Sequence, residues 1–250
     1  MQRSDSTGAD CAVSLLYPRG ERPDTAAIRE QARRSGLYTV GFDPGNGQAG
    51  DGWLELLLNG LTFDIQGLSP QPVEPASPSP NNFGLPDDFD PRDCEAVVLS
   101  PGPHLKVGKP MFPVVRSLAH IAADLAQMGS ARAVVWHPAR ASSEASYFRR
   151  AVLRWIEGGA FPGLGLAALT AAAEGGWQSE GLALFTGQEL RLDPELAEDG
   201  AQAAKTALRL LNWLVEHGTI DTPFRFTDPA GERFRIEPIE DGRILRAWRV

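Results

Sequence analysis

The sequence predicts an α+β protein in which helices pack on a mixed, largely antiparallel sheet. The segment 112–138 indicates an amphipathic helix that leads through a tight break into an apolar strand. Short alternating runs separated by turn residues, as at 53–65 and 224–248, indicate hairpins. Hairpins mixed with helices are typical of the α+β class.

The central helix is expected to begin at residue 112 and to end near Gly129, because Pro113 suits a first helical turn and glycine suits the left-handed residue that ends a helix. Apolar residues at three- and four-residue steps give it one apolar face: Val114, Leu118, Ile121, Leu125 and Met128. The residues expected on its polar face are Arg116, Ser117, His120, Asp124 and Gln127. Residues 133–136 form a continuous apolar run, which predicts a central strand covered on both faces.

The N-terminal part is expected to begin with a loose, disordered tail at 1–10, followed by a strand at 11–17. Asp24 can cap a helix that carries Ile28 and Ala32 inward until Gly36 ends it. Residues 41–52 hold four glycines and indicate turns rather than a regular element.

Residues 53–58 and 61–65 are expected to form a hairpin around Asn59-Gly60, the dipeptide that most readily accepts positive φ at both central positions of a type I′ turn. Between 69 and 93 come seven prolines, which remove backbone donors and predict a long crossing loop without a regular element. We expect one domain over 11–250, with two subdomains at 11–68 and 94–250 as the alternative.

The second half of the chain continues the mixed pattern, with a strand at 95–99 and a helix capped by Ser142 or Ser143 that stops at Gly158-Gly159. The apolar stripe expected on that helix is Ala145, Phe148, Val152 and Trp155. A strand is expected at 164–169, followed by a hairpin of 181–185 and 189–192 around Gly187.

A long helix is then expected to begin with a capping box of Asp199 and Gln202 and to end at Gly218. Its expected apolar face consists of Ala204, Leu208, Leu211 and Val215. The strands of a terminal meander are expected at 224–227, 233–237 and 244–248, with turns at 228–231 and 241–242.

Composition excludes several classes of protein. The formal net charge of −8 gives no basic surface for nucleic acid or for an anionic membrane. Two cysteines without metal-ligand spacing favour a reducing compartment, and no apolar run is long enough for a signal peptide or a membrane span. We therefore expect a cytoplasmic protein. No phosphate-binding loop, nucleophile elbow or zinc motif is present, so we expect no cofactor and no metal.

Two histidines are weak candidates for catalysis or ligand binding, because His104 and His137 each follow a predicted strand, where rigid scaffolds place functional side chains. Glu144 lies soon after His137 and joins them as a weak candidate. A pocket near these residues would indicate a small-molecule-binding protein or an enzyme.

Four arginines, Arg140, Arg149, Arg150 and Arg154, form a basic cluster on a chain of net negative charge. Complementary charge chiefly sets encounter rate and partner choice, so this cluster indicates a docking surface for an acidic protein partner. The leading functional expectation is therefore a non-enzymatic, protein-binding adaptor or immunity-type factor.

The chain also resembles a bacterial domain-of-unknown-function family, the one numbered forty-two sixty-one, mainly over 112–218. The resemblance is carried by four features: the helix leading into 131–136, the apolar strand after Phe161-Pro162, the motif Gly181-Leu182 with Phe185 and Glu189-Leu190, and the helix that closes at Glu216-His217-Gly218. It implies an α+β domain from a bacterial cytoplasm and supplies no catalytic residues.

Overall fold

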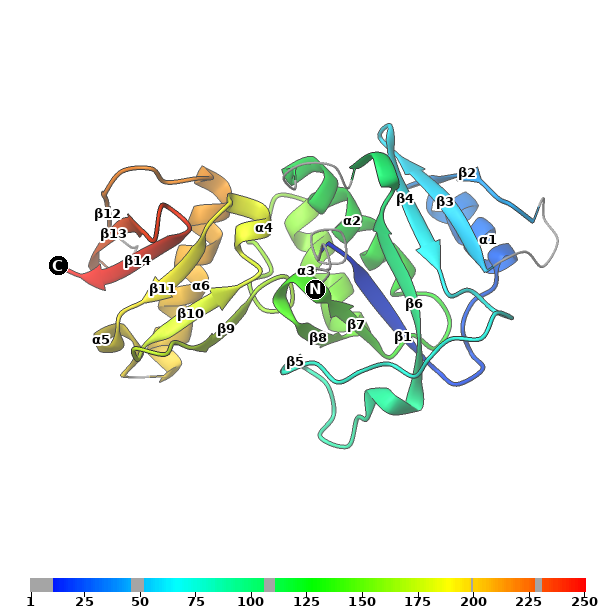
Figure 1. Ribbon diagram of the computed structural model, residues 1–250, viewed down its shortest axis with the longest axis horizontal. Helices are drawn as coiled ribbons and strands as arrows, with labels where there is room; N and C mark the ends of the chain where they lie inside the picture. Colours follow the sequence, from blue (N-terminus) through cyan, green and yellow to red (C-terminus); the bar gives the residue numbers. More distant parts are fainter. Residues whose placement is uncertain (1–10, 46–51, 106–110, 199, 228–230) are drawn as a thin grey trace, which may run out of the picture. The chain divides into compact units, whose positions relative to one another are not determined.

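A computed structural model describes residues 11–45, 52–105, 111–198, 200–227 and 231–250. The chain divides into two compact units, residues 1–159 and 160–250 (Figure 1). Each unit holds one mixed, mostly antiparallel sheet with helices, which confirms the α+β class. The expectation that 11–250 folds as a single domain stays a prediction.

The first unit contains an eight-stranded sheet in which neighbouring strands are antiparallel, except for the parallel pair β5 and β8. In spatial order the strands are β2 (Thr39–Phe42), β3 (Trp53–Leu58), β4 (Leu61–Gln66), β6 (Cys94–Pro101), β1 (Val13–Pro18), β7 (Ala133–Trp136), β8 (Ala141–Glu144) and β5 (Asn81–Phe83). Strands from both sides of the proline-rich segment share this sheet, since β4 pairs with β6.

Two strand predictions in this unit are confirmed. Asn59 and Gly60 have φ of 52° and 78°, and Leu58 pairs with Leu61 across the turn, as a type I′ hairpin requires. β7 lies between β1 and β8, and its four residues are all buried. The expectation that residues 41–52 form turns rather than a regular element was wrong at its first two residues, because Gly41 and Phe42 belong to β2, which pairs with β3. Positions 46–51 lie outside the described residues.

The described part of the first unit holds three α-helices: α1 (Thr25–Ser35), α2 (Phe112–Leu125) and α3 (Ala145–Ile156). α1 forms as expected, because the Asp24 carboxylate accepts a hydrogen bond from the backbone N–H of Ala27, and Gly36 ends the helix at φ 62°. The short 3₁₀ segments are η2 (Pro91–Asp93), η3 (Pro103–Leu105) and η4 (His137–Ala139).

The apolar face of α2 is buried as predicted, but its polar face is only partly exposed. Ser117 and Asp124, both expected outside, are buried. The Gln31 side chain of α1 donates to the Asp124 carboxylate at 2.9 Å, so α1 covers this part of α2. The helix also ends at Leu125 rather than at Gly129, which adopts positive φ in the following turn.

The predicted cap of α3 was wrong, although its apolar stripe was correct. Ser142 and Ser143 lie in β8, and the Glu144 carboxylate instead accepts hydrogen bonds from the backbone N–H groups of Ser146 and Tyr147. Both serines pair with residues of β7, and the helix begins only after them in the sequence. The buried residues of the stripe are Ala145, Phe148, Val152 and Trp155.

The expectation that residues 69–93, here called the strap, contain no regular element was wrong. Residues 81–83 are free of proline and keep their backbone donors, which allows β5 to pair with β8. The Ala76 N–H also donates to the Cys94 carbonyl at 3.1 Å. The strap therefore packs on the sheet, with Leu85 and Phe89 against the buried cluster of Leu16, Cys94, Ala133 and Val135.

The second unit contains a six-stranded sheet with one parallel pair, β11 with β14. In spatial order the strands are β12 (Phe224–Thr227), β13 (Arg233–Ile239), β14 (Ile244–Arg249), β11 (Glu189–Leu192), β10 (Trp177–Glu180) and β9 (Ala168–Ala171). Its helices are α4 (Ala183–Thr186), α5 (Pro194–Ala197) and α6 (Gly200–His217). The terminal meander β12–β13–β14 confirms the prediction; residues 228–230 of its first turn lie outside the described residues.

The predicted hairpin of 181–185 with 189–192 was wrong, because β11 pairs with Trp177–Glu180 instead. The half-buried Glu189 carboxylate accepts hydrogen bonds from the N–H groups of Gly181, Leu182 and Ala183. These N–H groups are therefore unavailable for strand pairing, and the segment forms the short helix α4 instead. The neighbouring strand predicted at 164–169 begins only at Ala168.

The phase of α6 differs from the prediction. Leu211 is buried as expected, whereas Ala204, Leu208 and Val215 are only half-buried. The side chains that face the core are Ala203, Thr206, Ala207, Leu210, Leu211 and Leu214. Apolar residues occupy two adjacent stripes along this helix, so packing against the sheet decides which of the two stripes is buried. Gly218 ends the helix at φ 78°, as predicted, and Asp199 of the expected capping box lies outside the described residues.

Candidate functional site

The strongest candidate site is in the first unit, where His137 meets the sheet. His137 begins η4, directly after the buried strand β7, and its Nε2 lies 2.8 Å from the Ser14 hydroxyl of β1. The His137 N–H donates to the Ala12 carbonyl, which holds the residue beside the first strand. The imidazole and the hydroxyl are therefore fixed by two paired strands rather than by a free loop.

A cavity of about 330 Å³ lies beside this pair, between the sheet and the strap. This volume is at the lower end of the range that small-molecule sites occupy. Its lining residues are Ser14, Leu16, Ala76, Ser77, Pro78, Ser79, Pro80, Ala96, Val135, His137 and Arg140. The floor comes from β1, β6 and β7, and the opposite wall comes from the strap.

The lining has a distinct chemical character. It combines an apolar floor, including Leu16 and Val135, with serines, His137 and Arg140, and none of the lining residues that the structure describes is acidic. Arg140 adopts φ 45° at the end of η4, which turns the chain from β7 into β8 beside the cavity. The described lining of the cavity therefore brings hydrogen-bonding side chains and an arginine together with an apolar surface.

His137 is poised to act as a neutral hydrogen-bonding group. His137 as a residue is exposed, but the protein removes part of the water around its ring, and this desolvation lowers the pKa of His137 below its usual value because it disfavours the charged form. The ring is therefore neutral near pH 7. In the tautomer protonated on Nδ1, the Ser14 hydroxyl donates to Nε2 and keeps its own lone pairs available as acceptors.

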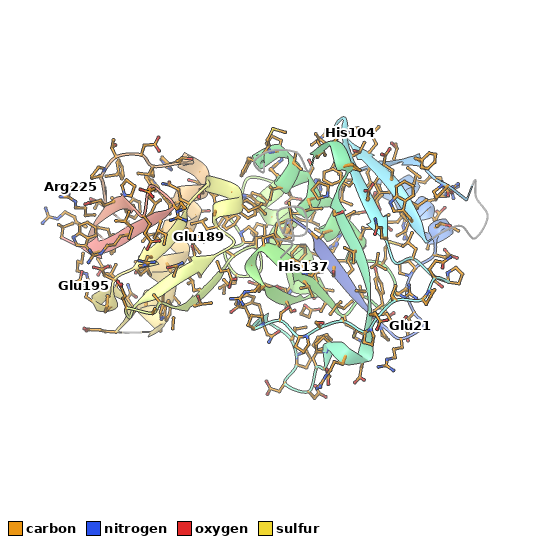
Figure 2. All side chains as sticks on the ribbon, viewed as in Figure 1. Glu21, His104, His137, Glu189, Glu195 and Arg225 are labelled. Carbon is orange, nitrogen blue, oxygen red and sulfur yellow. The ribbon has the colours of Figure 1, made fainter. Side chains whose placement is uncertain are left out.

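The two histidines singled out from the sequence do not converge. His104 is exposed in η3 after β6 and does not line the His137 cavity. Figure 2 shows the two side chains well apart within the first unit. A shared site of His104 and His137 is therefore not formed.

Glu144, the third weak candidate, serves as the cap of α3. Its carboxylate accepts from the Ser146 hydroxyl at 2.6 Å in addition to the N–H groups of Ser146 and Tyr147. Burial raises the pKa of Glu144, but these hydrogen bonds outweigh it and hold the pKa below the usual value. The carboxylate is thus ionised and engaged in stabilising the helix N-terminus.

The four arginines of the predicted docking cluster are distributed over two elements. Arg140 lines the cavity beside His137, whereas Arg149, Arg150 and Arg154 lie on α3. Arg150 donates to the Ser146 hydroxyl at 2.9 Å, and Arg154 is exposed. Their role in binding an acidic partner, and with it the adaptor or immunity function, stays a prediction.

Sequence reasoning missed Ser14 and the serines of the strap. Ser14 is the one small polar residue in the otherwise hydrophobic run 12–17, and it is 5% exposed. A polar residue inside a buried strand requires a partner, which is a usable signal. Its partner His137 is 123 positions away in sequence, however, so the pairing itself could be found only in the folded chain.

Other site types find no support in the described part of the chain. It contains no cluster of three or more histidine, cysteine or acidic residues able to hold a metal ion. No helix in the described ranges is both apolar and long enough to span a bilayer. Cys11 and Cys94 are free thiols. A cytoplasmic location stays a prediction.

Comparison of the chain with protein-family models, with curated proteins and with solved structures gave no match in any of the three. The resemblance to a bacterial family of unknown function stays a prediction. Functional inference consequently depends on the geometry of the site alone.

Proposed function

We propose that the protein binds a small organic acid in the cavity between the strap and the sheet. The observation that carries this proposal is the Ser14–His137 pair in the wall of a cavity whose described lining also contains Arg140 and no acidic residue. A carboxylate matches the Arg140 guanidinium and the neutral imidazole, because both can donate hydrogen bonds to its oxygens.

The remainder of the ligand is expected to be apolar and small. Leu16, Val135 and Ala96 form an apolar floor, and Pro78 and Pro80 face it from the strap. A cavity of about 330 Å³ is at the lower end of the range of small-molecule sites, so a compact ligand with a short aliphatic chain or one aromatic ring fits it. Benzoate and butyrate are therefore suitable probes.

We propose binding rather than turnover because the Ser14 side chain is nearly inaccessible. A nucleophilic serine requires a base within hydrogen-bond reach, and Nε2 of His137 fulfils that condition at 2.8 Å. Ser14 is only 5% exposed, however, and lies within a strand paired on both sides. The hydroxyl therefore orients the imidazole instead of attacking a substrate.

Isothermal titration with benzoate, butyrate and their uncharged amides tests the proposal. The wild-type chain should bind the acids and not the amides, because only the acids bear the charge that Arg140 complements. His137→Ala should weaken binding about tenfold or more, since a hydrogen bond to a charged group is worth about 1.5–3 kcal/mol. Arg140→Gln should weaken it in the same way.

His104→Ala is the matched control, because this exposed histidine lies outside the cavity. It should leave the affinity unchanged. Equal losses in His104→Ala and His137→Ala would contradict the proposed site. Failure of every acid in the series to bind the wild-type chain would contradict the proposed ligand class.

A further inference from the structure

An open sheet edge in the second unit offers a separate binding surface. β12 is the outermost strand of the six-stranded sheet, and among the described residues only β13 pairs with it. Phe224, Arg225 and Thr227 are exposed. An edge strand presents backbone N–H and C=O groups that lack partners, and such groups can pair with a strand of another chain.

One side of this edge is aromatic. Phe224 stacks on Trp213 of α6 with ring centroids 5.0 Å apart, and Phe226 lies 5.4 Å from the same indole. His217 stacks on Trp213 at 4.0 Å and extends the group. Phe224 remains 42% exposed, so an apolar surface lies next to the open edge.

The other side of the edge is basic. Side chains alternate along a strand, so Arg225 points away from the aromatic side, and it lies directly opposite Arg235 of β13. Like charges opposite one another are destabilising. Arg235 pairs with Glu237 at 3.3 Å and lies over the Trp248 ring, while no acidic partner of Arg225 is found among the described residues. An additional carboxylate beside Arg225 would relieve this repulsion.

We propose that β12 binds an extended segment of a partner protein in which acidic and apolar residues alternate. The segment adds as a seventh strand next to β12, and its backbone pairs with the open edge. Its acidic side chains lie beside Arg225, and its apolar side chains cover Phe224 and Phe226. The alternation follows from the two-residue period of strands, which gives the two sides of β12 opposite chemistry.

Two of the other sheet edges are less suited to this role. β2 carries an irregularity in its register between Val40 and Phe42, and such bulges twist an edge away from further pairing. β5 is only three residues long. β12 keeps a regular register over its four residues and adds an exposed aromatic ring to the edge.

Fluorescence anisotropy with labelled synthetic peptides tests the proposal on the intact chain. The probe is an eight-residue peptide of alternating glutamate and valine, and the comparison peptide replaces each glutamate by lysine. The glutamate peptide should bind about tenfold tighter or more, because it changes repulsion from Arg225 into attraction. Equal binding of both peptides, or binding of neither, overturns the proposal.

Backbone pairing is tested by two further glutamate–valine peptides, methylated on the backbone nitrogens of every second residue in opposite phases. Methylation of the phase that faces β12 should abolish binding, and methylation of the other phase should preserve it, because only alternate N–H groups face one neighbour. If the two methylated peptides bind with equal affinity, the peptide does not add as a strand. The proposal is then overturned, because only a contact between charged side chains remains.

The variant Arg225→Glu tests whether Arg225 is the residue that makes the protein prefer the acidic peptide. This variant should lose affinity for the glutamate peptide and gain affinity for the lysine peptide, and its thermal midpoint should not fall, since the residue is exposed and a glutamate at 225 would lie opposite Arg235. Arg154→Glu on α3 is the matched control, with the same charge change at another exposed arginine. Loss of binding in Arg154→Glu but not in Arg225→Glu overturns the proposed location.

Discussion

The two faces of the eight-stranded sheet are covered in different ways. α2 and α3 contact β1, β6, β7 and β8, and the side chains of Val13, Leu15, Val134 and Trp136 on one face are fully buried. On the opposite face the strap takes the place of helices. Beyond the His137 cavity, strap residues line two more cavities of about 520 and 220 Å³.

This difference has a physical origin. An amphipathic helix presents rows of side chains that fill the spaces of the surface beneath it. The strap is rich in proline, so it has few backbone N–H donors. It is held to the sheet by the pairing of its three-residue strand β5 with β8 and by isolated hydrogen bonds such as that from the Ala76 N–H to the Cys94 carbonyl. Helices therefore close one face of the sheet, and the strap leaves room for a ligand on the other.

The largest effect is expected on the helical face. Leu118 of α2 is fully buried, and Leu118→Ala should lower the free energy of unfolding by about 2–4 kcal/mol, because it removes apolar contacts and leaves a cavity. Urea titration followed by circular dichroism measures it. A loss below about 1 kcal/mol would show that this face is also loosely packed.

A matched pair of substitutions in β7 compares the two faces directly. Val134 and Val135 are neighbours of identical size, and the strand period points them to opposite faces. Val134→Ala should cost about 2 kcal/mol and Val135→Ala about 1 kcal/mol, because Val135 already borders a cavity. Equal losses in urea titrations would remove the distinction between the faces.

The strap should open without unfolding of the sheet. Its amide groups at Ala76 and Asn81 are bonded to the backbone at 3.1 and 3.3 Å but belong to a segment with few buried contacts. Hydrogen exchange measured by mass spectrometry should therefore be faster in 69–93 than in β7. Protection of the strap equal to that of β7 would mean that both open only in global unfolding.

The smallest effect concerns pH. Burial lowers the pKa of His137 in the folded state, so the unfolded chain binds more protons, and stability decreases as pH falls from about 7 through the usual histidine pKa of about 6.5. His137→Gln should flatten this dependence. His120, whose pKa is also lowered by burial, should preserve part of the slope in that variant.

The elements that were predicted correctly depend on residues close together in sequence. Asn59-Gly60 forms the expected turn because its two φ angles are set locally, and Gly36 and Gly218 end their helices for the same reason. The stripe of α3 was predictable because its apolar residues occupy a single face. The candidate site was predicted only in part, through His137 and Arg140.

The errors arose where distant groups compete for the same backbone or face. Nothing near residues 181–185 indicates that the Glu189 carboxylate will take three of their N–H groups, and nothing in the strap indicates that 81–83 will pair with β8. The phase of α6 was ambiguous because apolar residues occupy neighbouring stripes.

The sequence by itself determined the α+β class, the Asn59-Gly60 turn, the C-terminal ends of α1 and α6 and the apolar faces of α2 and α3, because steric limits on φ and the periods of helix and strand act over a few residues. The tertiary structure alone decided which face of α6 is buried, how the strap crosses the sheet and that Ser14 meets His137. Those choices depend on packing and hydrogen bonds between segments far apart in sequence. No local pattern carries that information, and the cavity beside His137 results from it.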